Sequence, residues 1–379
     1  MDAFLLNGRA YSHEQLRHGA IPADAHDEAR KVLEFSRQWL TGQEHFTMYT
    51  SGSTGTPKAI QLTRQQMVTS AGWTGRAVGL LPGDRALVCL SVDYIAGMMM
   101  LVRGFELGLS LTVVEPVSRP LAAWTPEMPW YDFTAMVPLQ LYETLRGEPH
   151  EQALLDCMKA ILIGGGPVSV ALEQDVQRIT APIYHTYAMT ETVSHIALRR
   201  LNGPQRSDRF VPFKEICLQQ DERGCLSITS VVTQGETVHT NDLVELHADG
   251  SFRWLGRLDH VINSGGVKVQ IEQVERAIEA WLLHYEGGAY ADRRFMVGPL
   301  EHPSLGQAVV ALIEGTAFGG QTLAPELETA IRAQWQQVLR PYEVPRHIYF
   351  VESLLETRTG KVDRRTNLQR LAAQHPMPA

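Results

Sequence analysis

Short apolar runs typical of strands alternate with longer segments of helical periodicity through the first half of the chain. One such repeat consists of the strand-like run "DRALVCLSV", the apolar helical segment "AGMMMLVRGFELGL" and the strand-like run "SLTVVEP". This alternation predicts parallel strands joined by crossover helices. Ligand-binding loops lie at the carboxyl ends of the strands in such sheets. We therefore expect an α/β fold whose site is built from the loops that follow the strands.

The pattern changes after about residue 205, where short strands separated by Asp-Gly and Arg-Gly turns predict a β-rich subdomain. A helical segment follows, and then strand, strand, helix, strand and an exposed tail. These elements are sufficient for a separate α+β domain. We expect a large N-terminal domain of parallel-rich sheets, helices and a β-rich subdomain over residues 1–257, and a small mobile C-terminal domain over residues 258–379.

Composition and charge exclude several classes of protein. The net charge of −8 argues against nucleic-acid binding, because nucleic-acid-binding proteins usually present a basic stripe. No apolar run approaches the roughly 18 residues of a transmembrane helix, and the first residues do not resemble a signal peptide. The four cysteines are widely spaced, which favours reduced thiols over a zinc site. We expect a cytoplasmic protein that does not insert into membranes. The sequence does not determine the oligomeric state, and a homodimer is one of the alternatives.

A polar loop, "YTSGSTGTPKAI", follows the strand-like run "FTMYT". It differs from a P-loop, in which glycine, lysine and then serine or threonine are consecutive, because Thr56 and Pro57 separate Gly55 from Lys58. Glycine N–H groups, hydroxyls and a lysine still suit a phosphate. The loop therefore predicts a phosphate-binding site, with a flexible surface turn as the alternative. The candidate ligands are Thr50, Ser51, Ser53, Thr54, Thr56 and Lys58.

Six further motifs follow this loop in the order "GGGPV", "YAMTE", "ND", "GRLD", "GGVKV" and "TGKVDR". Together the motifs resemble the adenylate-forming superfamily, which includes acyl- and aryl-CoA synthetases, peptide-synthetase adenylation domains and luciferases. The resemblance extends from about Tyr49 to Arg364. It implies an enzyme that uses ATP and Mg²⁺ to convert a carboxylate into an acyl-adenylate, and then passes the acyl group to a thiol, commonly coenzyme A.

The resemblance implies roles for the residues that would contact the phosphates and the metal. The loop from Ser51 to Lys58 would wrap the β- and γ-phosphates and later release pyrophosphate. Thr190 would contact the α-phosphate. Glu191 would hold Mg²⁺, an ion that proteins usually bind through one or two carboxylates together with the phosphates of the substrate.

The same resemblance implies a site for the adenosine. Tyr187 would lie against the adenine ring, and Asp242 would accept hydrogen bonds from both ribose hydroxyls. Arg257 would add a ribose contact. The turn that would flank adenine consists of Gly164, Gly165 and Gly166.

The resemblance also implies a moving C-terminal domain. Asp259 occupies the position of the hinge about which this domain would rotate between the two half-reactions. Lys361 would reach the carboxylate and the α-phosphate during adenylation and would stabilise the developing charge. The turn that would line the entry for the pantetheine arm of coenzyme A includes Gly265, Gly266 and Lys268.

The compact chain most resembles the short o-succinylbenzoate–CoA ligases of menaquinone biosynthesis. Their substrate carries a succinyl carboxylate, which reacts, and a ring carboxylate, which needs a partner. Ser194 and His195, just after the magnesium-binding motif, and Arg103 are the candidate partners. Tyr94 is a candidate for an apolar wall of the acid pocket.

Three functions remain open at this point. The first is a CoA ligase for o-succinylbenzoate, and the second is an enzyme that adenylates another aryl or acyl carboxylate for CoA or for a carrier-protein thiol. The third is a nucleotide-binding relative without turnover. Glu191, Asp242 and Lys361 argue against the third function, and the lack of a carrier-domain sequence disfavours a carrier protein as the acceptor.

Overall fold

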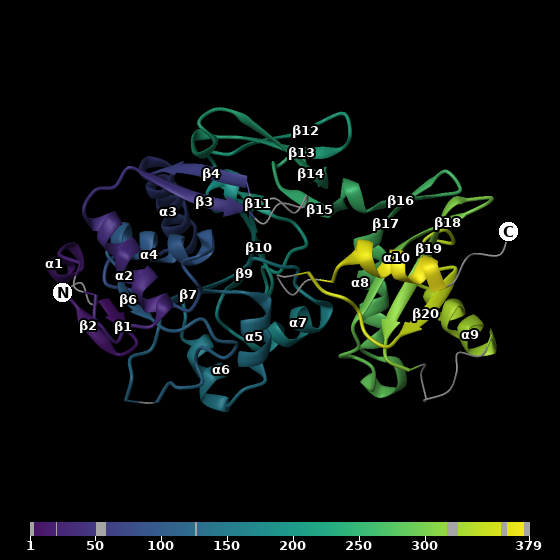
Figure 1. Cartoon of the computed structure of the whole chain (residues 1–379), viewed down its shortest axis with the longest axis horizontal. Coiled ribbons are helices and arrows are strands. Elements are labelled where there is room, and N and C mark those ends of the chain that lie inside the picture. The colour runs from purple at the N-terminus through teal and green to yellow at the C-terminus, as the bar shows by residue number, and fades with distance from the viewer. Residues whose placement is uncertain are drawn as a thin grey trace.

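The computed structural model describes residues 4–19, 21–50, 58–125, 127–316, 325–357 and 362–374. These residues form three sheets before Arg257 and a fourth sheet after it. Figure 1 shows the first three sheets with their helices as one lobe and the fourth sheet with its helices as another. We refer to residues 4–257 as the N-terminal lobe and to residues 261–374 as the C-terminal lobe. No helix in the described ranges is long and apolar enough to cross a membrane.

The largest sheet of the described chain has nine strands in the order β11-β10-β9-β8-β7-β5-β6-β1-β2. The strands from β9 to β1 in this order are parallel to one another, and the strands at both edges are antiparallel. The predicted α/β fold with a parallel-rich sheet is therefore confirmed. The strands are β1 (Phe4–Leu6), β2 (Arg9–Tyr11), β5 (Arg85–Val88), β6 (Ser110–Val113), β7 (Phe133–Met136), β8 (Ala160–Ile163), β9 (Ile183–Ala188), β10 (His195–Arg200) and β11 (Val211–Pro212).

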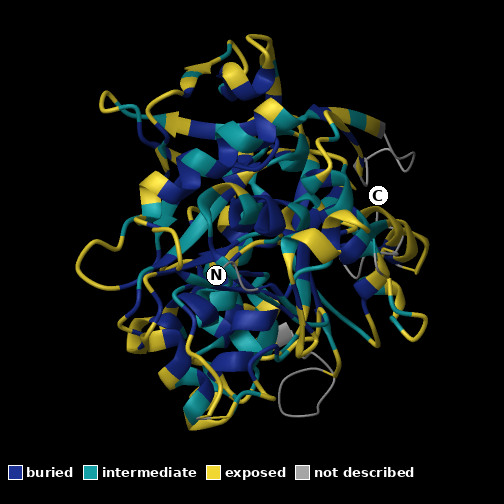
Figure 2. Ribbon diagram, turned by 90° about the vertical axis from the view of Figure 1, so that its left-hand side faces the viewer, coloured by how far each residue is buried: buried dark blue, intermediate teal, exposed yellow. Residues whose placement is uncertain are grey.

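Helices cover both faces of this sheet. Successive residues of a strand point to opposite faces, so a single strand contributes side chains to both of the cores that the helices enclose. In β5, Ala86 and Val88 belong to the core formed with α2, α3 and α4, whereas Leu87 belongs to the core formed with α5, α6 and α7. Figure 2 shows that buried residues gather along the strands and the helix faces that meet them. The helices are α1 (His13–Arg17), α2 (Asp27–Leu40), α3 (Arg64–Val78), α4 (Ile95–Leu107), α5 (Pro138–Leu145), α6 (Pro149–Asp156) and α7 (Val170–Asp175).

The polar loop after "FTMYT" does not follow a strand of the parallel sheet, and this part of the prediction was wrong. It connects β3 (His45–Thr50) to β4 (Lys58–Thr63), which form a separate antiparallel pair. β4 continues directly into α3, where Thr63 and Gln66 form a capping box that starts the helix. Residues 51–57 lie outside the described residues, so the predicted phosphate ligands among them are not placed.

The β-rich subdomain is confirmed as a four-stranded antiparallel sheet of β12 (Cys217–Gln220), β13 (Cys225–Thr229), β14 (Thr237–Leu246) and β15 (Phe252–Arg257). The C-terminal sheet contains β16 (Val261–Ser264), β17 (Val267–Gln270), β18 (Phe295–His302), β19 (Gly306–Glu314) and β20 (His347–Val351). The helices of this lobe include α8 (Ile271–Leu282), α9 (Pro325–Trp335) and α10 (Arg364–Gln374).

Helix α10 replaces most of the exposed tail expected from the sequence. Leu371 is buried, and the side-chain amide of Asn367 exchanges hydrogen bonds with the backbone N–H and C=O of Leu355 at 3.0 and 2.9 Å. These contacts fix the helix against the C-terminal sheet. The surrounding sequence is so polar that its few apolar residues did not indicate a helix.

The two lobes meet where α7 faces α8 (Figure 1). Glu173 on α7 is buried and receives hydrogen bonds from Arg199 Nη2 at 2.8 Å and from Arg276 Nη2 at 2.5 Å. Arg199 belongs to β10 of the same lobe, whereas Arg276 belongs to α8 of the C-terminal lobe. One turn further along α8, Glu279 accepts a hydrogen bond from the backbone N–H of Val170 at the start of α7, at 3.0 Å. A third carboxylate, Asp292 of the C-terminal lobe, accepts a hydrogen bond from the Tyr142 hydroxyl on α5 at 3.1 Å, so three carboxylates connect the lobes in this conformation.

Candidate functional site

The turn after β8 lies against the last residues of β9, because these two strands are parallel neighbours and Ile163 at the end of β8 pairs with His185. Gly164 directly follows β8, and a Cβ atom added there would lie 2.2 Å from Thr186 Oγ1 of β9. Glycine is therefore required for this close approach of the two strands. Gly165 has a φ of +81°, a left-handed conformation that also favours glycine. The predicted adenine turn therefore lies directly against β9, which ends within the "YAMTE" motif.

A short 3₁₀ turn, η2 (Thr190–Thr192), carries the predicted α-phosphate and magnesium residues. Thr190 is half-buried and Glu191 is exposed at the carboxyl end of β9. In the described ranges, no cluster of three or more His, Cys, Asp or Glu side chains could hold a metal by itself. A single exposed carboxylate suits Mg²⁺, because this ion keeps several waters and is commonly completed by substrate phosphates.

Three of the predicted adenosine residues meet, although they come from three different strands. Tyr187 of β9 donates its hydroxyl hydrogen bond to Asp242 Oδ2 of β14 at 2.5 Å, and Arg257 Nη1 at the end of β15 lies 3.8 Å from Asp242 Oδ1. Burial, reinforced by the charge of Asp242, raises the pKa of Tyr187, so its hydroxyl stays protonated and donates. The Tyr187 ring contacts Phe210 and Phe252 edge-on, with centroids 5.8 and 5.1 Å apart.

The predicted hinge residue is bound to the same arginine. Arg257 donates hydrogen bonds from Nε and Nη2 to Asp259 at 2.9 and 3.2 Å. The hydrogen bond from Arg257 is the main reason why the pKa of Asp259 is lowered. Arg257 therefore lies between Asp242 of the N-terminal lobe and the short turn η4 (Leu258–His260) that leads to the C-terminal lobe.

The predicted residues of the C-terminal lobe are placed only in part. Gly265 and Gly266, both with positive φ, form an exposed two-residue turn between β16 and β17, and Lys268 follows it with an exposed side chain. Two glycines suit a tight hairpin turn because both central residues need φ above zero. Lys361 lies outside the described residues.

A buried polar cluster brings together the three candidate partners of a substrate carboxylate. Arg103 Nη2 on α4 donates to Ser194 Oγ at 2.9 Å, and Ser194 Oγ lies 3.4 Å from His195 Nδ1. Thr74 Oγ1 on α3 lies 3.2 Å from both Arg103 Nε and His195 Nε2. The four residues are between 0% and 7% exposed. We refer to Thr74, Arg103, Ser194 and His195 as the Arg103 cluster.

The charge of the Arg103 cluster is not compensated within the described chain. No described carboxylate forms an ion pair with Arg103, although the residue is only 2% exposed. Burial lowers the pKa of Arg103 to about 9, so the guanidinium remains charged at neutral pH. Burial and the charge of Arg103 lower the pKa of His195 far below its usual value, so the imidazole is neutral.

Close packing of α3 on α4 positions Thr74 against Arg103. A Cβ atom added at Gly75 would lie 2.9 Å from Leu107 Cδ1 of α4, so glycine permits the close approach of the two helices at this level. Thr74 was not among the residues predicted from the sequence. Its role depends on which face of α3 meets α4, and a lone threonine in a helical segment does not indicate that.

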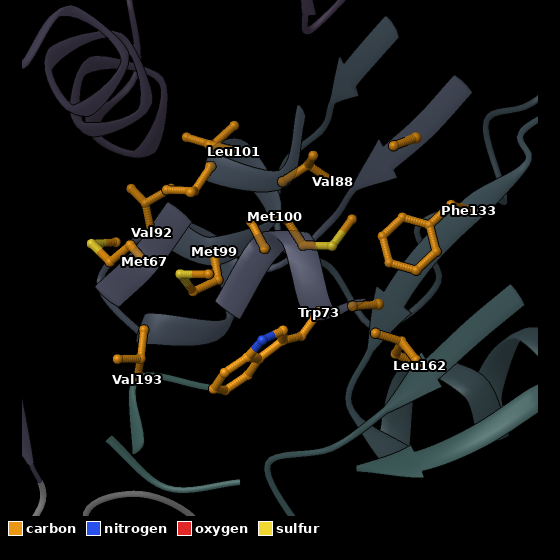
Figure 3. Close-up of a cluster of buried hydrophobic side chains, with 14 of the residues drawn as sticks. Met67, Trp73, Val88, Val92, Met99, Met100, Leu101, Phe133, Leu162 and Val193 are labelled. Atoms are coloured by element: carbon orange, nitrogen blue, oxygen red, sulfur yellow. The ribbon is translucent and has the colours of Figure 1, made fainter. Parts of the chain in front are cut away.

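A strained turn connects the magnesium motif to the Arg103 cluster. Val193 has φ 68° and ψ −57°, and the backbone N–H of Ser194 donates to Thr192 O at 2.8 Å. This is the γ-turn of the rare, strained form, and it is costly for a β-branched residue. Val193 is fully buried in the apolar cluster that includes Met67 and Met99 (Figure 3). The packing holds the turn, which directs Glu191 to solvent and Ser194 to the interior.

Tyr94 lies apart from these residues. It precedes the first residue of α4 and is 67% exposed. Arg103 lies nine residues further along the same chain, which corresponds to about 13 Å along a helix axis. The structure therefore does not bring Tyr94 to the Arg103 cluster.

The sequence and the fold were compared with those of known proteins. The sequence model of a family described as AMP-binding enzyme matches residues 17–237, and that of its C-terminal domain matches residues 296–361. A 2-succinylbenzoate–CoA ligase from Geobacillus kaustophilus is 27% identical, over 86% of this chain and 68% of that protein. A probable 2-succinylbenzoate–CoA ligase from Mycobacterium tuberculosis is 30% identical, over 94% of this chain and 91% of that protein. The crystal structure of an acyl-CoA synthetase (AMP-forming)/AMP-acid ligase II-like protein from Dyadobacter fermentans is 41% identical, with a TM-score of 0.61, and covers 95% of this chain and 99% of that one.

Proposed function

Because the chain belongs to the AMP-binding enzyme family, we propose that it uses ATP to activate 2-succinylbenzoate as an acyl-adenylate and then transfers the acyl group to coenzyme A. The single observation that carries the choice of acid is the buried, uncompensated charge of Arg103. A buried charge without a counter-ion costs several kcal/mol, on the order of the whole stability margin of a domain. An anionic substrate group at Arg103 supplies the missing partner, and the names of the two relatives indicate a dicarboxylic acid.

In the first half-reaction, an oxygen of the succinyl carboxylate attacks the α-phosphorus of ATP. A bond forms between this oxygen and phosphorus, the bond to the β-phosphate oxygen breaks, and pyrophosphate leaves. Thr190 and Glu191, on the short turn that follows β9, would serve the α-phosphate and Mg²⁺. Mg²⁺ neutralises phosphate charge when it is bound. Asp242, aligned by Tyr187 and Arg257, supplies an acceptor for the ribose hydroxyls.

In the second half-reaction, the sulfur of coenzyme A attacks the acyl carbon, the thiol loses its proton, and AMP leaves. We propose that residues 258–379 form a domain that rotates at Asp259 between the two steps, with Gly265, Gly266 and Lys268 near the pantetheine arm. Lys361 then serves the first step only. We expect Lys361→Ala to lose adenylation and to retain thioester formation from supplied acyl-adenylate; equal loss in both steps would contradict this role.

Pyrophosphate release with ATP and Mg²⁺ tests the proposed acid. We expect turnover of 2-succinylbenzoate, much weaker turnover of 4-oxo-4-phenylbutanoate, which lacks only the ring carboxylate, and none with benzoate. Mass spectrometry after addition of coenzyme A should detect the acyl thioester. Equal turnover of the first two acids would remove the role of Arg103 in recognition. Turnover only with benzoates that lack a succinyl arm would overturn the substrate, and inactivity with all carboxylates would overturn the enzyme itself.

A further inference from the structure

The hydroxyl of Thr74 has three neighbours within hydrogen-bonding distance. Its Oγ1 lies 3.1 Å from the backbone oxygen of Ser70, 3.2 Å from Arg103 Nε and 3.2 Å from His195 Nε2. A hydroxyl has one proton to donate and two lone pairs to accept with. The Ser70 oxygen can only accept, so the Thr74 proton is directed there. Arg103 Nε–H can only donate, so it occupies one lone pair of Oγ1.

This proton count determines the protonation of His195. Thr74 has no proton left for His195 Nε2, so Nε2 must carry a proton and donate it to the second lone pair of Thr74 Oγ1. Because the imidazole is neutral, Nδ1 then has only a lone pair. The Ser194 hydroxyl, at 3.4 Å, donates to Nδ1, and Ser194 Oγ accepts from Arg103 Nη2. The hydrogen bonds therefore form a chain with a single direction. Arg103 donates to Ser194, and Ser194 donates to His195. His195 donates to Thr74, and Thr74 donates to the backbone oxygen of Ser70.

The consequence concerns which group remains for a ligand. Both ring nitrogens of His195 and the proton of Ser194 are committed within the cluster. Arg103 Nη1 has no hydrogen-bond partner among the described residues, and Nη2 uses only one of its two protons. The free donors of the cluster therefore belong to Arg103, although the sequence had suggested His195 and Ser194 as equal candidates.

We infer that Thr74 is a positioning residue: it holds His195 as the Nε2–H tautomer and orients Arg103 so that its Nη donors face the non-reacting carboxylate of the acid. The identity of that carboxylate rests on the proposed function. The hydrogen-bond directions do not, because they follow from the protein groups alone. Residues that act through another group in this way change recognition of the acid more than the chemical step.

The first test reads the tautomer of His195 without any substrate. ¹⁵N-histidine labelling, with assignment by His195→Gln, should show protonated Nε2 and unprotonated Nδ1 in the wild-type protein at pH 7. In Thr74→Val, which keeps the shape but removes the hydroxyl, the two tautomers should mix. Thr74→Ser should restore the wild-type signal. An Nδ1–H tautomer or an imidazolium in the wild-type protein would overturn the inference, whether or not any acid is turned over.

The second test reads recognition of the acid. Thr74→Val leaves Arg103 Nε without a partner, so KM for 2-succinylbenzoate should rise by roughly 10- to 100-fold, with kcat changed much less. KM for 4-oxo-4-phenylbutanoate should stay close to the wild-type value, and Thr74→Ser should recover most of the loss. Thr69→Val is the matched control, because the Thr69 hydroxyl also donates to a backbone oxygen one turn earlier in α3 but does not contact Arg103. Equal rises in KM for both acids, or no rescue by serine, would overturn the positioning role.

Discussion

Replacement of Arg103 by methionine should separate recognition of the two carboxylates of the acid. Methionine preserves much of the length of the side chain and removes the guanidinium. Truncating one partner of a buried charge pair costs about 2–5 kcal/mol, which corresponds to roughly a 30- to 4,000-fold loss at 1.4 kcal/mol per tenfold change. The ring carboxylate does not react and is bound equally in the ground and transition states, so we expect the loss mainly in KM for 2-succinylbenzoate.

The same substitution should leave the fold intact. Arg103 donates to Thr74 and Ser194, but each of these hydroxyls keeps His195 as a second partner. Removal of Arg103 also removes a buried charge that has no acidic partner in the described chain. The midpoint of thermal unfolding should therefore be unchanged or raised in the free enzyme.

Steady-state pyrophosphate release gives kcat and KM for 2-succinylbenzoate and for 4-oxo-4-phenylbutanoate in both proteins. The ratio of kcat/KM values for the two acids should fall toward one in Arg103→Met. A loss of the same size for both acids would show that Arg103 does not bind the ring carboxylate. A large drop in the unfolding midpoint would show that its charge is compensated within the protein.

Three further outcomes follow from the contacts of the Gly164 turn, from the contacts between the lobes and from the burial of His185. Gly164→Ala places a methyl group about 2 Å from Thr186 Oγ1, so KM for ATP should rise, and the added Thr186→Ala should restore much of the loss. Glu173→Gln leaves buried positive charge uncompensated, at a cost of about 3–5 kcal/mol, and should lower the unfolding midpoint. Arg276→Ala should spare that midpoint, and both variants should broaden the interlobe distances seen by small-angle X-ray scattering; unchanged scattering would contradict the contact. The pKa of His185 is lowered to about 4 by burial and a neighbouring arginine, so the unfolded chain binds its proton first and stability should fall as pH drops from about 6.5 toward 4. As the pH is lowered over this range, the urea concentration at the midpoint of unfolding should fall less in His185→Asn than in the wild-type protein. Parallel curves of this midpoint against pH for the two proteins would refute this.

The sequence predicts the parts of the molecule that depend on local pattern. Strands β5, β6, β8 and β9 and helices α3, α4 and α8 are long enough, or apolar enough, for their periodicity to indicate them. β4 was missed because "KAIQLT" directly adjoins both a polar loop and a helix. The family resemblance also predicts that Tyr187, Asp242 and Arg257 lie together, and these three side chains do meet.

What the sequence does not predict depends on tertiary packing. The hydrogen bond from Tyr187 to Asp242 joins residues 55 positions apart, and it exists only because two sheets pack together. Val193 is β-branched and would ordinarily avoid positive φ, so no local pattern indicates its γ-turn. Thr74 acquires its role only when α3 meets α4. These are the contacts that orient side chains within the site.

The pairing of Glu173 has a consequence for how the lobes part. The carboxylate has two arginines from its own lobe, Arg199 and Arg206, and one from the other, and Arg276 is about half exposed even when bound. If α8 withdraws in the proposed rotation of the C-terminal domain, Arg199 still neutralises Glu173 and the guanidinium of Arg276 returns to water it already touches. No charge is stranded in the interior, so the joint opens without the penalty that normally locks a buried ion pair. Salt in the medium would weaken this contact between the lobes, because its arginine from the C-terminal lobe is already in contact with water.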